Sequence, residues 1–155
     1  MNQTASTKPV TAPHSALLLP AAYLVHFAEE WFGGLHLWAG EVLGTAISVD
    51  RFLAINGAGF VIFVTGTLAA YLSPAMAWLA VAIAALFGLN AILHTLATLY
   101  FGSYSPGMVS GLLIYLPLSF FVLRQLAARL PAGTLAMAVV VGVLMHGLAT
   151  WTALA

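Results

Sequence analysis

The chain has 155 residues, of which 63% are hydrophobic and only 5% are charged. Soluble domains carry charge on about a quarter of their residues, so this composition excludes an ordinary water-exposed surface and indicates a membrane protein. The formal net charge is zero, and three arginines and one lysine are too few to build a phosphate-binding surface, so we expect no nucleic-acid partner. The absence of cysteine excludes disulfides and thiolate metal sites.

The hydrophobic segments predict an all-α, polytopic membrane protein with a bundle of five transmembrane helices, because a spanning helix needs about 20 mostly apolar residues. Residues 1–14 are polar and predict a flexible N-terminal tail, and residues 15–155 predict a single transmembrane domain. The five helices are expected at about 15–32, 51–72, 75–101, 108–124 and 134–153. We interpret the first as an uncleaved span, because a histidine and two glutamates stand where a secretory signal would have its cleavage site.

The segments between these helices also carry signals. Residues 33–49 hold His36, Glu41 and several glycines, a pattern that suits an interfacial or re-entrant piece better than a span. Asp50 is expected to be the N-cap of the second helix. Pro117 is expected to kink the fourth helix.

Five spans place the two termini on opposite sides of the bilayer. With a cytoplasmic N-terminus, Lys8, Arg124 and Arg129 lie inside and only Arg51 lies outside. The positive-inside rule favours that orientation. We therefore expect the N-terminus in the cytoplasm.

The most unusual stretch is His26-Phe27-Ala28-Glu29-Glu30, which places a histidine and two carboxylates in an apolar segment without a neighbouring Lys or Arg. Ionisable residues inside a membrane are costly and indicate a functional site. On a helix, Glu29 at i+3 and Glu30 at i+4 share one face with His26. This face is therefore expected to turn toward the interior of the bundle.

Other polar residues of the predicted spans lie at a similar depth. With a helical rise of about 1.5 Å per residue, all of these polar residues lie within roughly 3–17 Å of the outer membrane boundary. The residues of this layer are His26, Glu30, Asn56, Asn90, His94 and His146. The agreement among four helices predicts one shared site.

The donors in this layer are sufficient to ligate one or two transition-metal ions. We expect a divalent transition metal, either zinc, iron or manganese. The expected ligands are His26, Glu29, Glu30, His94 and His146. Asn90 and Asn56 are expected to orient the ligands or to bridge helices through hydrogen bonds. Tyr104 lies in a turn on the same side of the membrane, and Glu29, Glu30 and Tyr104 are therefore the candidate catalytic groups.

Several blocks of this sequence together resemble a known family. The blocks are His26-x-x-Glu29-Glu30, Asn90-x-x-x-His94 and Tyr104-x-Pro106-Gly107, followed by Ser110. In this order they are similar to the HXXEE family of small bacterial integral membrane proteins. The resemblance implies a multi-pass protein of the bacterial cytoplasmic (inner) membrane, and it brings no established activity with it.

The leading functional hypothesis is a membrane-embedded metal-binding protein in contact with the lipid bilayer. It includes a metalloenzyme, either a hydrolase or an oxidoreductase, that acts on a lipid-soluble or membrane-adjacent small hydrophobic molecule. One alternative is a metal-free acid–base isomerase or apolar-ligand-binding protein. Another is a proton-relay or transport component. The substrate, the reaction and the oligomeric state stay open at this point.

Overall fold

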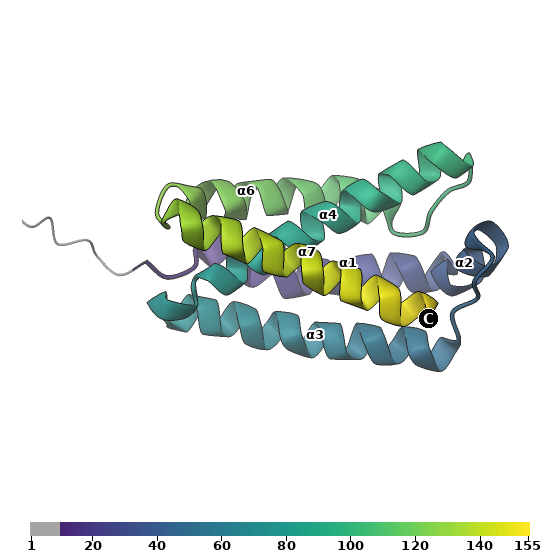
Figure 1. The fold of residues 1–155 in the computed structure, drawn as a ribbon, viewed down its shortest axis with the longest axis horizontal. Coiled ribbons are helices and arrows are strands. Elements are labelled where there is room, and N and C mark those ends of the chain that lie inside the picture. Colours follow the sequence, from purple (N-terminus) through teal and green to yellow (C-terminus); the bar gives the residue numbers. More distant parts are fainter. Residues whose placement is uncertain (1–9) are drawn as a thin grey trace, which may run out of the picture.

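The computed structural model describes residues 10–155, which form helices and contain no strand (Figure 1). The all-α class predicted from the sequence is therefore confirmed. Residues 1–9 of the predicted tail lie outside the described residues, and a 3-10 helix begins at His14. The elements in chain order are η1 (His14–Leu18), α1 (Leu19–Phe32), α2 (Leu35–Leu43), α3 (Val49–Leu72), η2 (Pro74–Met76), α4 (Trp78–Phe101), α5 (Met108–Ser110), η3 (Gly111–Tyr115), α6 (Leu116–Ala127) and α7 (Ala132–Leu154).

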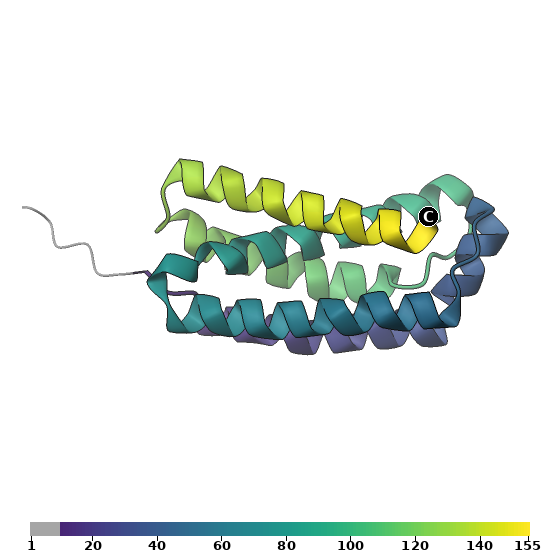
Figure 2. The same ribbon diagram turned by 60° about the horizontal axis from the view of Figure 1, so that its bottom comes forward.

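The long helices lie side by side in a bundle, and α4 crosses it obliquely between the others (Figures 1 and 2). Helices α1, α4 and α7 run in one direction, and α3 and α6 run in the opposite one. The short helix α2, the loop after α4 and the C-terminus all lie at the same end of the bundle (Figure 1). The chain segments that form the candidate site therefore meet at this end.

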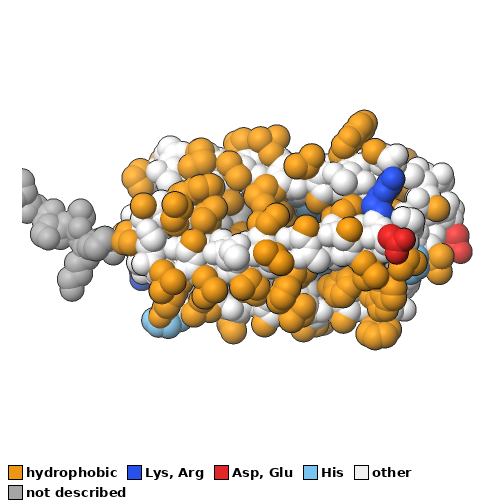
Figure 3. Space-filling view, turned by 90° about the horizontal axis from the view of Figure 1, so that it is seen from below, with side chains coloured by type: hydrophobic (Ala, Val, Ile, Leu, Met, Phe, Trp, Pro, Cys, Tyr) orange, Lys and Arg blue, Asp and Glu red, His pale blue; other side chains and the backbone are white. Residues whose placement is uncertain are grey.

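Among residues 10–155, four helical segments are long and apolar enough to cross a membrane: α3, η2 with α4, α5 to α6, and α7. Five spans were predicted, but α1 has only 14 residues after the five residues of η1 and does not reach the length of a span. In α3 and α7 less than a fifth of the most apolar window is buried inside the protein. Figure 3 shows hydrophobic side chains along the whole length of one face, with charged groups near its ends. Such an exposed apolar surface indicates a membrane protein.

Two local features differ from the sequence-based expectations. The N-cap of α3 is Ser48, whose hydroxyl accepts a hydrogen bond from the Arg51 backbone amide at 3.3 Å. The prediction of Asp50 as N-cap is wrong, and Asp50 lies in the first turn, where a negative charge also stabilises the helix. Pro117 was expected to kink its helix, and the feature that the structure shows there is a π-helical turn, Gly111–Tyr115, just before the proline.

Residues 33–49, expected to be interfacial or re-entrant, contain the nine-residue helix α2. Gly34 and Gly44 flank it with φ angles of +73° and +74°, which glycine adopts at little cost. The Trp38 indole donates a hydrogen bond to the Ser103 hydroxyl at 3.2 Å, and its ring packs against Phe101. Helix α2 therefore covers the end of the bundle and is attached to the loop after α4.

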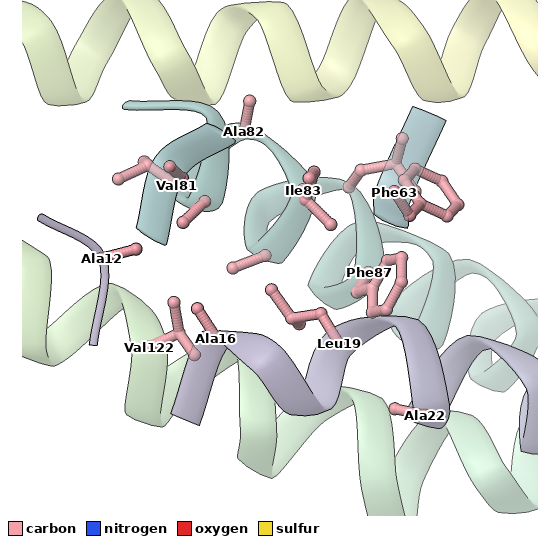
Figure 4. Close-up of a cluster of buried hydrophobic side chains, with 14 of the residues drawn as sticks. Ala12, Ala16, Leu19, Ala22, Phe63, Val81, Ala82, Ile83, Phe87 and Val122 are labelled. Carbon is pink, nitrogen blue, oxygen red and sulfur yellow. The ribbon is translucent and has the colours of Figure 1, made fainter. Parts of the chain in front are cut away.

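The core forms where α4 meets its neighbours, with small residues on several of the contacting surfaces (Figure 4). Leu19, Phe87 and Val122, from α1, α4 and α6, are buried together. A Cβ atom on Gly142 of α7 would lie 2.3 Å from the carbonyl oxygen of Ala82. Small residues are what allow membrane helices to approach this closely.

Candidate functional site

Three polar side chains converge inside the bundle: His26 and Glu30 of α1 and His94 of α4. The Oε1 atom of Glu30 lies 3.2 Å from His26 Nε2 and 3.3 Å from His94 Nε2. His26 is 2% exposed and Glu30 6% exposed. The i, i+4 spacing on α1 places the first two side chains on one face, and α4 brings the third from across the bundle. We refer to these three residues as the His–Glu group.

The other ring nitrogen of each histidine is held by a serine. His26 Nδ1 lies 2.8 Å from the Ser110 hydroxyl, and His94 Nδ1 lies 2.9 Å from the Ser105 hydroxyl. Both serines belong to the segment that follows α4, so this one segment orients both imidazoles. Metal-binding histidines are usually held in this way, with one nitrogen hydrogen-bonded and the other free to bind the ion.

Glu29 points elsewhere, although the sequence placed it among the ligands. Its carboxylate accepts hydrogen bonds from the backbone amides of Gly107, Val109 and Ser110 at 3.1, 2.9 and 2.6 Å. It also accepts one from the Tyr104 hydroxyl. These amides lie at the start of α5, where the helix dipole favours an anion. Glu29 therefore fastens the turn after α4 onto α1.

Tyr104 was a candidate catalytic group, and the structure places it on Glu29 rather than in the His–Glu group. Partial burial, together with the hydrogen bond to the Glu29 carboxylate and its negative charge, raises the pKa of Tyr104 to about 12. The neutral phenol is therefore the form that stabilises this contact.

Gly107 lies in the turn after α4, where the backbone comes close to both histidine rings. Its φ angle is +106°, and a Cβ atom there would lie 2.8 Å from His26 Cε1 and 2.9 Å from His94 Cε1. The backbone of the turn thus packs directly on both imidazoles. A glycine is required here for its conformation and for the close approach.

His26 faces Glu30 with its Nε2 atom and Ser110 with its Nδ1 atom. In the tautomer whose Nδ1–H donates to the Ser110 hydroxyl, Nε2 of a neutral imidazole keeps its lone pair. Within the described residues His26 Nε2 is buried without a hydrogen-bond partner. In that tautomer the lone pair of His26 Nε2 faces Glu30 Oε1 at 3.2 Å, and a cation or a proton between the two atoms would stabilise the contact.

The donor spacing fits a metal ion. Zinc–nitrogen and zinc–oxygen bonds of about 2.0–2.2 Å in a tetrahedral site place neighbouring donor atoms about 3.3–3.5 Å apart. The two nitrogen–oxygen distances of the His–Glu group are 3.2 and 3.3 Å, and its ligand atoms all lie within 4.8 Å of one another. The His–Glu group could therefore hold a metal ion.

A cavity of about 320 Å³ adjoins the His–Glu group, and the remaining predicted polar residues line it. Asn56 accepts a hydrogen bond from the Tyr23 hydroxyl at 2.6 Å. Asn90 Nδ2 lies 3.4 Å from His146 Nε2. His146 thus lies on the cavity wall, outside the His–Glu group. His36 does not line the cavity, and its ring stacks on Trp31.

Sequence reasoning missed three contributors. Ser105 is an unspecified position in the block Tyr104-x-Pro106-Gly107 and Ser110 follows that block, and nothing in the sequence pattern links either serine to a histidine. Tyr115 is 1% exposed and stacks on His26 with ring centroids 4.3 Å apart. Its signal in the sequence is a tyrosine in the middle of an apolar span, where a hydroxyl group needs a partner.

The fold and the site together define a helical membrane protein with a buried histidine–glutamate group. A family model described as "Protein of unknown function with HXXEE motif" matches residues 17–122, which include the motif and every residue of the His–Glu group. The match covers more than half of the chain, and the protein belongs to this HXXEE family. No curated protein and no solved structure showed significant similarity to the chain.

Proposed function

We propose that the protein is a membrane-embedded metal-binding protein in which His26, Glu30 and His94 ligate one divalent transition-metal ion. The observation that supports this most directly is the approach of two imidazole Nε2 atoms to the same carboxylate oxygen at 3.2 and 3.3 Å. The two serines that hold the opposite ring nitrogens add to it. Zinc, iron and manganese all accept a donor set of two nitrogens and one oxygen.

Three protein ligands leave a coordination position free, as in catalytic metal sites. The cavity lies beside the His–Glu group and gives a small molecule space to reach it. A bound divalent ion would supply Lewis acidity to a hydrolase, and a redox-active one would serve an oxidoreductase. In this proposal Glu29 and Tyr104 act by holding the turn after α4, while Asn90 and His146 form part of the cavity wall.

We further propose that η1 and α1, His14–Phe32, cross the bilayer together as a fifth segment beside the four long helices. They lie in the same bundle and are packed into its core. The protein is then a multi-pass protein of the bacterial cytoplasmic membrane with a cytoplasmic N-terminus. Because the chain has no cysteine, single cysteines introduced at Gly44 and at Arg129 can be labelled selectively in intact cells. Labelling of residue 44 from outside, with residue 129 protected, is expected, and the reverse pattern would refute this orientation.

The metal proposal is tested by element analysis of the protein purified in mild detergent. Wild type is expected to retain one zinc, iron or manganese per chain, and His26→Ala, Glu30→Gln and His94→Ala to lose it. His14→Ala and His36→Ala are matched controls, since neither histidine belongs to the His–Glu group. If wild type carries no such metal after reconstitution with each ion, the proposal fails.

The same geometry favours one second candidate, a metal-free acid–base site. A proton shared between Glu30 and either imidazole would also satisfy the facing acceptor atoms. The two candidates differ in their response to chelation. Ligand binding that persists after complete removal of metal would favour the acid–base site.

A further inference from the structure

The cavity beside the His–Glu group is mostly apolar. Leucine, isoleucine, phenylalanine and alanine side chains from α2, α3, α4 and α7 form most of its wall. Among its lining residues in the described chain Glu30 is the only carboxylate, and no Lys or Arg is present. At about 320 Å³ it has the size of a small-molecule site. Its occupant should therefore bury a hydrocarbon body and carry few polar groups.

Besides His26 Nε2, which faces Glu30, two buried polar atoms of cavity-lining residues lack a hydrogen-bond partner within the described residues: the Tyr115 hydroxyl and Asn90 Oδ1. A buried polar group without a partner loses the hydrogen bonds that it makes in water, and a ligand that supplies the partner recovers this loss. A phenol can donate, and an amide oxygen can only accept. An alcohol both donates and accepts, so its hydroxyl group can pair with either atom. A carboxylate cannot pair with Asn90 Oδ1, and a hydrocarbon can pair with neither.

Tyr115 is held beside the His–Glu group. Its ring is packed between His26, at 4.3 Å between ring centroids, and Phe87, at 4.0 Å. It ends the π-helical turn Gly111–Tyr115, and such turns inside α-helices are frequent at functional sites. The stacking on His26 places the Tyr115 ring next to a candidate metal ligand.

A second hollow, between α4 and α7, lies beside the cavity. It shares four lining residues with the cavity: Leu93, His146, Thr150 and Leu154. Several of its other lining residues, Val143 and Trp151 among them, are exposed on the apolar surface of the bundle. The cavity and the hollow therefore adjoin at a wall that faces the region occupied by lipid.

We infer that the cavity binds an apolar alcohol that enters from the bilayer between α4 and α7, and that Tyr115 hydrogen-bonds its hydroxyl group next to the His–Glu group. This inference rests on the proposed function and identifies the class of molecule that the metal site would meet. Tyr115 is thereby a specificity-determining residue.

The test uses the full chain in lipid nanodiscs and a photoreactive diazirine alkanol as the probe. Cross-linked peptides are mapped by mass spectrometry while decanol, decane, decanoate or decylamine competes over the same range of mole fractions in the lipid. Decanol is expected to suppress labelling of the α4 and α7 cavity peptides at a mole fraction about tenfold lower than the other three need. Equal competition by decane, or stronger competition by decanoate or decylamine, would overturn the inference.

Two variants sharpen this test. Tyr115→Phe keeps both ring stacks and is expected to weaken competition by decanol about five- to tenfold while leaving decane unchanged. Tyr100→Phe is the matched control, because Tyr100 is 84% exposed on the surface. Leu93→Trp, at a residue shared by the cavity and the hollow, is expected to block labelling. A folded Tyr115→Phe variant with wild-type selectivity for decanol would refute the role of Tyr115.

Metal content separates this inference from the proposed function. Tyr115→Phe is expected to keep the metal content of wild type, since Tyr115 is not among the proposed ligands. If wild type contains no metal but discriminates decanol from decane through Tyr115, the metal proposal fails and the alcohol site stands. If metal is bound and the selectivity is absent, the alcohol site fails and the metal proposal stands.

Discussion

Glu29 and Glu30 are consecutive residues with different partners. Glu29 accepts hydrogen bonds from three backbone amides at the start of α5, whereas Glu30 Oε1 faces the Nε2 atoms of His26 and His94. One carboxylate thus attaches a turn to α1, and the other belongs to the candidate metal site. The two acidic residues of the motif have separable roles.

Substitution of each glutamate should separate these roles. Glu29→Gln loses a charged acceptor of several hydrogen bonds and is expected to destabilise the protein by about 1–3 kcal/mol. Glu30→Gln removes a proposed ligand and is expected to abolish metal retention. Thermal unfolding and element analysis of both variants check this. Metal loss in Glu29→Gln equal to that in Glu30→Gln, at unchanged stability, would contradict the assignment.

Gly107→Ala should damage both the turn and the His–Glu group. The added methyl group would lie less than 3 Å from both imidazole rings, at a φ angle of +106°. We expect at least a tenfold loss of metal affinity together with a destabilisation of about 1–2 kcal/mol or more. Gly102→Ala is the matched control, because Gly102 also has a positive φ, +61°, and a Cβ atom there meets nothing within 4 Å. Gly102→Ala should therefore be destabilised without a loss of metal affinity.

The two serines should tune metal affinity without binding the ion. Ser105→Ala and Ser110→Ala each remove the partner of one histidine Nδ1, and such losses typically lower metal affinity about 10–100-fold. Competition with a chelator of known affinity measures the change. Ser119→Ala is the control, because Ser119 is buried and its hydroxyl lacks a partner among the described residues. Its affinity should equal that of wild type.

The contact between Tyr104 and Glu29 should depend on pH at the alkaline end. The folded protein raises the pKa of Tyr104 from 10 to about 12, so it favours the protonated phenol. The contact therefore makes its full contribution to the free energy of unfolding below pH 10, and this contribution falls as pH rises from 10 to about 12. In Tyr104→Phe this contribution is absent at every pH. The difference in melting temperature between wild type and variant should shrink over that interval, and a constant difference would contradict it.

Gly142 should be needed for the packing of α7 on α4. A methyl group at this position would overlap the carbonyl oxygen of Ala82 at 2.3 Å, so Gly142→Ala must push the two helices apart. We expect a destabilisation of about 1–3 kcal/mol, measured by unfolding in detergent. Gly147→Ala, five residues further along α7, meets nothing within 4 Å and should be neutral or slightly stabilising. Equal effects of the two substitutions would refute the packing argument.

The helices and part of the site could be predicted from the sequence because both depend on local pattern. Apolar segments of sufficient length predicted the all-α class, and four helices reach spanning length where five were expected. The i, i+4 spacing of His26 and Glu30, and the similar depth of His94, predicted residues that the structure brings together. These inferences require only the rise per residue and the number of residues per turn of an α-helix.

The remaining features depend on the path of the chain outside the helices. Helical geometry placed Glu29 on the same face as His26, but it could not show that the turn after α4 returns to meet that carboxylate. For the same reason Ser105 and Ser110 could not be assigned to their histidines. Tyr115 was missed because its neighbours come from α1 and α4, and nothing in the adjacent sequence indicates them.

The distribution of the His–Glu group along the chain has a consequence for biosynthesis. His26 and Glu30 lie on α1, His94 lies on α4, and the two orienting serines come later still. A nascent chain that has emerged only as far as α3 carries two of the three proposed ligands and neither serine. If the His–Glu group binds a metal as proposed, the ion would be acquired after membrane insertion of the second half of the protein, because an ion that arrives earlier would meet an incomplete site.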